Sequence, residues 1–132
     1  MSYRNSKWVN RNQVIEYIYA DLSKTEESTE EEILKDLEEN YNFNQQTIDI
    51  ILYYSKHKKE IKNQVQPLLK ENWFFKRLPV IDRTIFFAII SEYTLIKTKK
   101  AILISEAMKI ANSYAEFKTI SYINPILEKI LN

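Results

Sequence analysis

A short run of basic residues near the N-terminus has the residue types and the spacing that bind nucleic acid. Arg4, Lys7 and Arg11 follow one another at intervals of three and four residues, which places them on one side of a helix or of the arm before it. Cations in such a row contact phosphates and give affinity without choosing a base. Trp8 lies among them and carries a ring that can stack on a splayed base.

Each of these four residues also has a purely structural interpretation. The three cations fit an ordinary solvated helix start, although a helix dipole offers cations nothing favourable at that end. Trp8 fits packing against the body of the fold. The sequence leaves both interpretations open, and the functional one predicts that nucleic-acid binding depends on Lys7 and Arg11.

The composition excludes most catalytic and metal-binding chemistry. The chain has no Cys, no Gly and a single His, so thiolate metal sites, Gly-rich phosphate loops and EF-hand loops are absent. His57 lies beside Lys56, Lys58 and Lys59, and no motif places a nucleophile next to it, so we interpret it as part of a solvated helix face. The acidic run 26–39 matches no metal loop and is also interpreted as a solvated helix. We predict no enzyme activity, no cofactor and no metal.

One apolar stretch, residues 78–93, predicts the element that the fold is built around. Pro79 suits a helix start because its fixed φ is already helical. The run that begins at Ile85 has no polar break before Ser91, and a helix that is apolar all round normally lies in a core. It is too short to cross a membrane. We therefore predict one helix with Ile85, Ala88 and Ile89 buried and the other helices packed around it.

Apolar residues recur at helical spacing in five further stretches, at 6–22, 29–37, 44–65, 101–114 and 119–131. Thr29 and Glu32 form a capping box, and Asn44 suits the N-cap of a long helix that Pro67 ends or kinks. No stretch reads as a convincing strand. These patterns predict an all-α fold, a single compact helical domain of six or seven helices over residues 1–132. Without a signal peptide or a membrane-length apolar run, we expect a soluble, cytoplasmic protein.

The last predicted helix has a proline at position 125. A proline deep in a helix removes one backbone hydrogen bond and clashes with the preceding turn. We therefore predict that this helix either begins late, with Asn124 as N-cap and Pro125 at the first helical position, or begins near Ser121 and kinks. A late start would leave Tyr122 on the preceding loop.

Several blocks of the chain occur in the order and spacing of a known family. They are Trp73, LPVIDRTIFFAIISEY (78–93), ISEAMKIANSYA (104–115) and YINPILEKIL (122–131), together with Arg11 and Ile18-Tyr19 in the first helix. In these blocks the chain resembles the NusB family of transcription antitermination factors. The resemblance implies a NusB-like all-helical domain, and nothing after residue 132 is expected to supply the methyltransferase to which some family domains are attached.

The resemblance also implies partners and contact residues. NusB proteins bind a short single-stranded boxA RNA together with the small-subunit ribosomal protein that doubles as NusE, and so keep the RNA polymerase elongation complex moving through ribosomal RNA operons. By resemblance, the expected RNA contacts are Arg4, Lys7, Trp8, Arg11, Lys118 and Tyr122. The expected contacts to the NusE-type protein are Tyr19 and Asp82. Because some relatives dimerise, a homodimer is left open.

These assignments have structural alternatives as well. Tyr122 also fits a core aromatic residue beside Ile123, and Lys118 also fits a solvated loop residue. Tyr19 also fits the edge of an amphipathic helix. Asp82 also fits a carboxylate at the positive end of a helix dipole. The basic motif before the first helix is also thinner than in the family pattern. The alternative function is therefore a protein-interaction module that keeps the fold and has lost RNA recognition.

Overall fold

The computed structural model describes residues 9–114 and 117–132, with the side chains of 117–121 left out. Within those residues the chain forms seven α-helices and no strand, which confirms the predicted all-α class. The elements are α1 (Arg11–Leu22), α2 (Glu30–Asn40), α3 (Gln45–Lys56), α4 (Lys58–Val65), η2 (Gln66–Leu68), η3 (Phe75–Arg77), α5 (Val80–Ile96), α6 (Lys100–Tyr114) and α7 (Phe117–Ile130), where η marks a 3-10 helix. No helix in the described part combines the length and hydropathy needed to cross a membrane.

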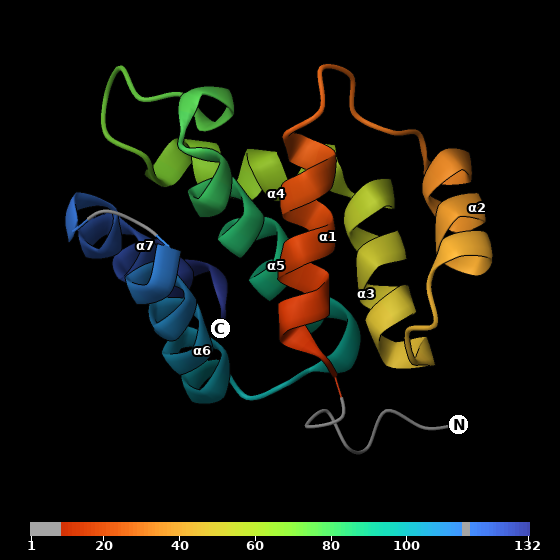
Figure 1. Cartoon of the computed structure of the whole chain (residues 1–132). Helices are drawn as coiled ribbons and strands as arrows, with labels where there is room; N and C mark the ends of the chain where they lie inside the picture. Colours follow the sequence, from red (N-terminus) through yellow and green to blue (C-terminus); the bar gives the residue numbers. More distant parts are fainter. Residues whose placement is uncertain (1–8, 115–116) are drawn as a thin grey trace.

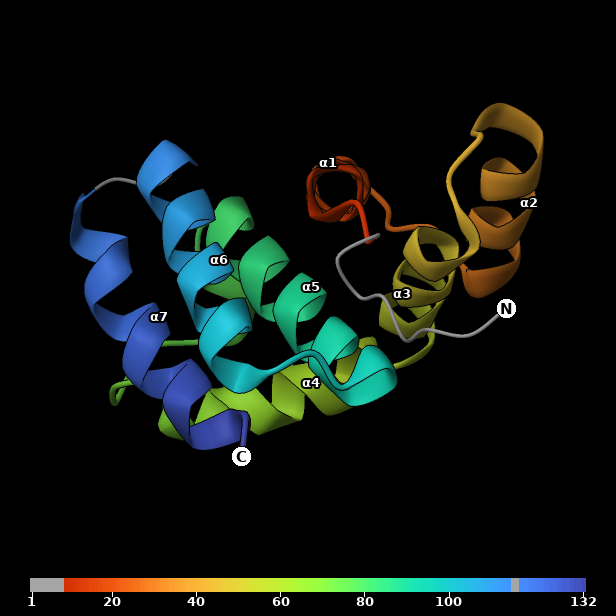
Figure 2. The same ribbon diagram turned by 90° about the horizontal axis from the view of Figure 1, so that it is seen from below.

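Helix α5 is the centre of the fold, as the apolar stretch predicts. It packs against α1, α3, α4, α6 and α7, which surround it in both views (Figure 1, Figure 2). Ile85, Ala88 and Ile89 are 0%, 5% and 2% exposed, which confirms their predicted burial. The helix begins at Val80 and ends at Ile96 rather than spanning 78–93, because Pro79 takes the N-cap position and Lys97 turns into the left-handed region.

The N-terminal half of the chain forms one side of the domain. Helix α1 begins after Asn10, whose side chain accepts a hydrogen bond from the backbone N–H of Gln13. Helix α2 begins with the predicted capping box of Thr29 and Glu32, with both of its hydrogen bonds formed. Helix α2 packs mainly on α3 and lies at the outer edge of the domain, away from α6 and α7 (Figure 2).

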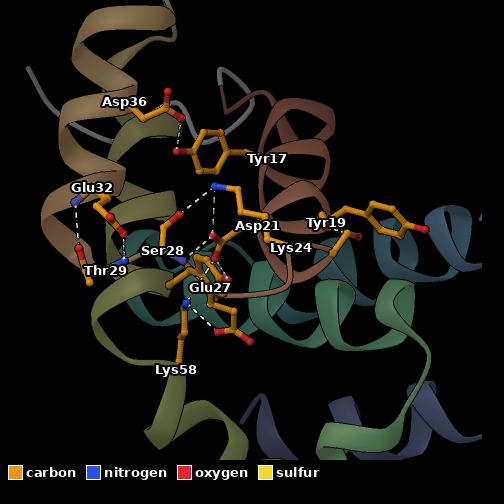
Figure 3. Close-up of polar contacts among 12 residues, drawn as sticks. Tyr17, Tyr19, Asp21, Lys24, Glu27, Ser28, Thr29, Glu32, Asp36 and Lys58 are labelled. Atoms are coloured by element: carbon orange, nitrogen blue, oxygen red, sulfur yellow. Dashed lines mark hydrogen bonds and ion pairs between the residues drawn. The ribbon is translucent and has the colours of Figure 1, made fainter.

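The buried carboxylate of Asp21 holds the connection between α1 and α2 against α3 and α4. Asp21 is 2% exposed, and its carboxylate accepts hydrogen bonds from the Tyr54 hydroxyl at 2.6 Å and the Ser28 backbone N–H at 3.1 Å (Figure 3). The Lys58 ammonium lies 3.3 Å from the same carboxylate. Burial by itself would raise the pKa of Asp21, but the hydrogen bonds and the charge of Lys58 outweigh it, so its pKa is lowered. Asp21, which precedes the acidic run 26–39, is therefore a structural residue, and Lys58 also pairs with Glu27 inside that run at 2.9 Å.

The long helix predicted from Asn44 is interrupted in the structure. Asn44 is its N-cap, as predicted, but the helix ends at Lys56 and a second one begins at Lys58. His57 lies at the junction, half-buried, with its ring stacked 3.9 Å from that of Tyr53 and its Nδ1 3.0 Å from the Tyr53 carbonyl oxygen. The interpretation of His57 as a residue of a solvated helix face is therefore wrong.

The last helix does not begin at its proline. Helix α7 runs from Phe117 to Ile130 with Pro125 inside it, so the predicted start at Asn124 or near Ser121 is wrong. Ile123 lies before the proline and Leu127 after it, and both are 0% exposed. Burial of an apolar stripe on both sides of Pro125 therefore outweighs the lost backbone hydrogen bond. Tyr122 is consequently a helix residue, fixed in orientation by α7.

Candidate nucleic-acid interface

Two residues that the sequence assigned to different partners are bonded to each other. Tyr122 of α7 donates a hydrogen bond from its hydroxyl to Oδ2 of Asp82, in the first turn of α5. Asp82 is 0% exposed, and its second oxygen, Oδ1, has no hydrogen-bond partner among the described residues. Burial raises the pKa of Asp82 and outweighs the opposing effect of Tyr122, while burial and the nearby carboxylate raise the pKa of Tyr122 above its ordinary value.

These two residues line an aromatic pocket of about 340 Å³. The residues that line it are Asn72, Trp73, Phe74, Arg77, Leu78, Pro79, Asp82 and Tyr122. The Trp73 and Tyr122 rings meet edge to face at 5.4 Å. Trp73 and Phe74 are 40% and 50% exposed, so much of their ring surface is open to a ligand. We name this feature the Trp73 pocket.

Two cations lie against the aromatic side chains of the Trp73 pocket. The Lys70 ammonium is 5.5 Å from the centroid of the Trp73 ring, and the Arg77 guanidinium is 5.9 Å from that of Phe74. Aromatic faces next to cations are the combination that binds single-stranded nucleic acid, because the rings stack on bases and the cations contact phosphates. The pocket can therefore hold a base without performing any chemical step.

A small set of local contacts explains why two neighbouring aromatic residues stay outside the core. Phe75 is the buried anchor of this segment, at 2% exposed. The amide side chain of Gln66 donates to the Trp73 carbonyl and accepts from the Phe75 backbone N–H, both at 2.8 Å. Asn72 takes a positive φ of 71°, which reverses the chain before the aromatic residues. With Phe75 turned inward, Trp73 and Phe74 are left at the surface.

A second pocket, of about 510 Å³, lies among α1, α5 and α6. Its exposed aromatic residues are Tyr19 and Tyr114, at 45% and 57%. Tyr19 points away from the polar cluster around Asp21 (Figure 3). Ile81 lines this second pocket and its neighbour Asp82 lines the Trp73 pocket, so the first turn of α5 separates the two. We name this second feature the Tyr19 pocket.

Arg11 forms an ion pair with the buried Glu92. Its Nε and Nη2 donate to the two carboxylate oxygens of Glu92 at 2.8 and 2.7 Å, and its side chain is 18% exposed. Glu92 is 2% exposed and also accepts from the Thr98 hydroxyl at 2.7 Å. Glu92 and Asp82 are ten residues apart on α5, which is about 15 Å along a helix axis. Arg11 and the Trp73 pocket are therefore at opposite ends of α5.

The remaining predicted RNA contacts are not placed by the structure. Arg4, Lys7 and Trp8 lie outside the described residues, and Lys118 lies in α7 with its side chain among those left out. The sequence pointed to Trp73 only as a family marker. It did not single out Phe74 and Arg77, which line the Trp73 pocket, or Lys70, which lies against the Trp73 ring. The signal was present in the run WFFKR, where two exposed aromatic residues precede one buried anchor and two exposed basic residues follow it. In the described part of the chain, no group of three His, Asp or Glu residues is placed to hold a metal ion.

Comparison with known proteins matches this sequence to one family. The sequence model of the NusB family matches residues 9–132. A relative named transcription antitermination protein NusB, from Crocosphaera subtropica (strain ATCC 51142 / BH68), is 28% identical over 89 residues, which cover 67% of this chain and 42% of the relative. A protein of the same name from Gloeothece citriformis (strain PCC 7424) is 26% identical over 94 residues, covering 71% of this chain and 44% of the relative. The chain thus spans less than half the length of these curated relatives. Because the family model covers most of the sequence, the chain belongs to the NusB family.

Proposed function

We propose that this domain is a transcription antitermination factor that performs no chemical step. In this proposal it binds single-stranded boxA-like RNA jointly with a NusE-type ribosomal protein, in the cytoplasm, and keeps RNA polymerase elongating through ribosomal RNA operons. The observation that carries the proposal is the family match over residues 9–132. The two relatives described above bear the name of an antitermination protein.

The Trp73 pocket supports the RNA part of the proposal. It combines half-exposed aromatic rings with Lys70 and Arg77 at ring distance, which suits a base stacked on a ring with its phosphate near a cation. Tyr122 is half-buried and belongs to this pocket. Its predicted RNA contact would therefore be made as part of an aromatic cluster and not from a free loop.

The Tyr19 pocket supports the protein part of the proposal. Exposed tyrosines beside apolar side chains are typical of protein interfaces, where an aromatic ring supplies contact area and a hydroxyl supplies a hydrogen bond. Tyr19 and Tyr114 are exposed here, and the buried Ile15 lines the pocket beside them. Asp82 is buried and lines the Trp73 pocket instead of the Tyr19 pocket. Its predicted contact to the ribosomal protein therefore has less support than that of Tyr19.

The experiment that tests the proposal is a titration of labelled boxA-type RNA, with and without the ribosomal protein, at several salt concentrations. Lys7→Gln is expected to weaken RNA binding and to reduce the salt slope by about one, since one fewer counterion is released. Lys62→Gln, an exposed cation on α4 outside both pockets, is the matched control and should leave the slope unchanged. Equal slopes for both variants would contradict phosphate contact by Lys7.

Arg11 needs a paired design, because its substitution also removes the partner of Glu92. Arg11→Gln combined with Glu92→Gln removes both charges and leaves no buried carboxylate unpaired. Weaker RNA binding by this double variant, compared with Glu92→Gln alone, would support RNA contact by Arg11. Equal binding by the two would assign Arg11 a structural role only.

The alternative function is a protein-interaction module that has lost RNA recognition. The ion pair between Arg11 and Glu92 favours it, because one cation of an already thin basic motif has a structural partner. This alternative predicts that the ribosomal protein binds through the Tyr19 pocket while boxA-type RNA adds nothing to that affinity. A cooperative gain on adding RNA would exclude it.

A further inference from the structure

Glu16 is the one acid of α1, α5 and α6 whose carboxylate has no partner among the described residues. It is exposed on α1 and forms no ion pair or hydrogen bond through its side chain in that part of the chain. The other acids of these three helices are all bonded to another side chain; they are Asp21, Asp82, Glu92 and Glu106. The Glu16 carboxylate is therefore available to a group from outside the domain.

The cations of the same three helices have partners of their own. Within the described structure each one contacts a carboxylate or a backbone carbonyl away from Glu16. The pairs are Arg11 with Glu92, Arg83 with the Leu78 carbonyl, Lys100 with Glu128 and Lys109 with Glu106. The negative charge of Glu16 is therefore not neutralised by a side chain of these helices.

Glu16 lines the Tyr19 pocket, where the polar side-chain atoms of the described lining residues are all oxygens. The carboxylate of Glu16 is joined there by the hydroxyls of Tyr19, Ser113 and Tyr114. An ionised carboxylate only accepts hydrogen bonds, and hydroxyls can accept them as well. A phosphate group would meet like charge at Glu16. The pocket therefore suits a guest that is positively charged and carries several N–H donors.

We propose that the Tyr19 pocket binds an arginine side chain of the partner protein. This inference rests on the proposed function, because it names the group that the ribosomal protein supplies to this pocket. The guanidinium donates to the Glu16 carboxylate and lies against an exposed tyrosine ring, where cation–π attraction adds to the ion pair. The methylene groups of the arginine pack on the buried Ile15 and Ile81, which give the pocket its apolar wall.

Arginine fits this pocket better than lysine does. Its planar guanidinium carries five N–H donors, which can reach a carboxylate and neighbouring hydroxyls at the same time. It also stacks on aromatic faces and is less strongly hydrated than an ammonium group, so its transfer into a partly apolar pocket is easier. The Trp73 pocket has the opposite charge, since Arg77 lines it and Lys70 lies against its Trp ring. The two pockets therefore select guests of opposite charge.

Glu16→Gln tests the charge of the pocket with little change in shape. The full chain and the NusE-type ribosomal protein are titrated by isothermal titration calorimetry at several salt concentrations. At low salt the variant is expected to bind about 10-fold more weakly, the scale of one hydrogen bond to a charged group. Its salt dependence should also be flatter, because one attractive charge is gone. Glu60→Gln, at an exposed carboxylate of α4 outside both pockets, is the matched control and should bind like the wild type.

Two double variants test the aromatic surface separately from the charge. Tyr19→Phe with Tyr114→Phe keeps both ring faces, whereas Tyr19→Leu with Tyr114→Leu removes them. The Phe pair should bind the ribosomal protein more tightly than the Leu pair, because a guanidinium is attracted to a ring face and not to an aliphatic group. All four positions changed in these tests are exposed, so the fold is expected to survive, and circular dichroism checks it.

A scan of the partner identifies the arginine itself. Each arginine of the ribosomal protein is replaced by glutamine and tested against the wild-type domain and against Glu16→Gln. One replacement should weaken binding to the wild type about 10-fold and cost nothing further against Glu16→Gln, which is the signature of a coupled pair in a double-mutant cycle. Lysine at the same position should restore the affinity only in part.

The outcomes separate this inference from the proposed function. Equal affinity of the wild type and Glu16→Gln at every salt concentration overturns the arginine assignment while the proposed function stands, and so does a scan in which no arginine couples to Glu16. Tighter binding of boxA-type RNA by Glu16→Gln, with unchanged binding of the ribosomal protein, also overturns it, because the pocket then faces RNA. A ribosomal protein that does not bind the wild-type domain, with or without boxA-type RNA, overturns the proposed function itself.

Discussion

Arg11 and Glu92 form a bidentate ion pair that joins the first residue of α1 to the C-terminal part of α5. The two N–H···O distances are 2.8 and 2.7 Å, and the partners are 81 residues apart in sequence. Glu92 is 2% exposed, so without Arg11 its charge would stay inside the protein, and its remaining hydrogen-bond partner among the described residues would be the Thr98 hydroxyl. The pair therefore ties the N-terminal end of α1 to the central helix α5.

Arg11→Gln is expected to lower the free energy of unfolding by about 2–3 kcal/mol, because it leaves a buried carboxylate without its partner. Urea denaturation followed by circular dichroism measures the loss. Adding Glu92→Gln should recover part of it, since the unpaired charge is then removed. If the single and the double variant lose equal stability, the ion pair does not couple α1 to α5.

Asp21 is expected to make the stability of the domain depend on pH in acid. Its folded-state pKa is lowered by hydrogen bonds from Tyr54 and Ser28 and by Lys58, which together outweigh burial. A lowered pKa contributes stability above the unfolded value of about 4, and this is lost as pH falls through the folded value. Asp21→Asn should therefore destabilise the protein at pH 7 by about 2 kcal/mol.

The measurement for Asp21 is the difference in unfolding free energy between the wild type and Asp21→Asn at several pH values. The difference should stay constant from about pH 7 to 5 and shrink below about pH 4. Lys24 and Glu27 also face this cluster. Glu60→Gln, at an exposed site outside the cluster, serves as a control that should show no such change with pH. A difference that grows in acid would mean that the pKa of Asp21 is raised.

Ile89→Ala is expected to destabilise the domain by about 2–5 kcal/mol, through lost burial and the cavity left inside the core. Ile89 is 2% exposed on the central helix. Ile102→Ala on α6, where the side chain is 46% exposed, is the matched control and should change stability by less than about 0.5 kcal/mol. Thermal and urea unfolding compare the two. Equal effects would contradict the central position of α5.

Lys97→Gly is expected to stabilise the protein by about 0.5–1 kcal/mol. Lys97 follows α5 with φ 67° and ψ 31°, a left-handed conformation that Gly adopts without the steric penalty of a side chain. Lys97→Ala keeps that penalty and removes only the lysine side chain, so it should bring no gain. A higher unfolding midpoint for the Gly variant alone checks the prediction, and a gain shared by both variants would point to charge instead.

Features that depend on short stretches of sequence were predictable. The capping box of Thr29 and Glu32, the N-cap at Asn44 and the burial of Ile85 all follow from spacing within a turn or two of helix, and the structure confirms them. Pro125 shows where local reasoning failed. Its effect on α7 was judged from the backbone alone, while burial of Ile123 and Leu127 against the rest of the fold decided the outcome.

The sequence by itself therefore determined the all-α class, the central helix and the family, because helical periodicity, caps and ordered motif blocks are local properties of the chain. Only the tertiary structure decided that Arg11 binds Glu92, that Tyr122 binds Asp82, and that Trp73 borders a pocket. Those pairs are 81 and 40 residues apart, and no local pattern encodes which helix faces meet. Packing of several helices around α5 brings them together, and the same packing buries Asp82 with one oxygen unpaired.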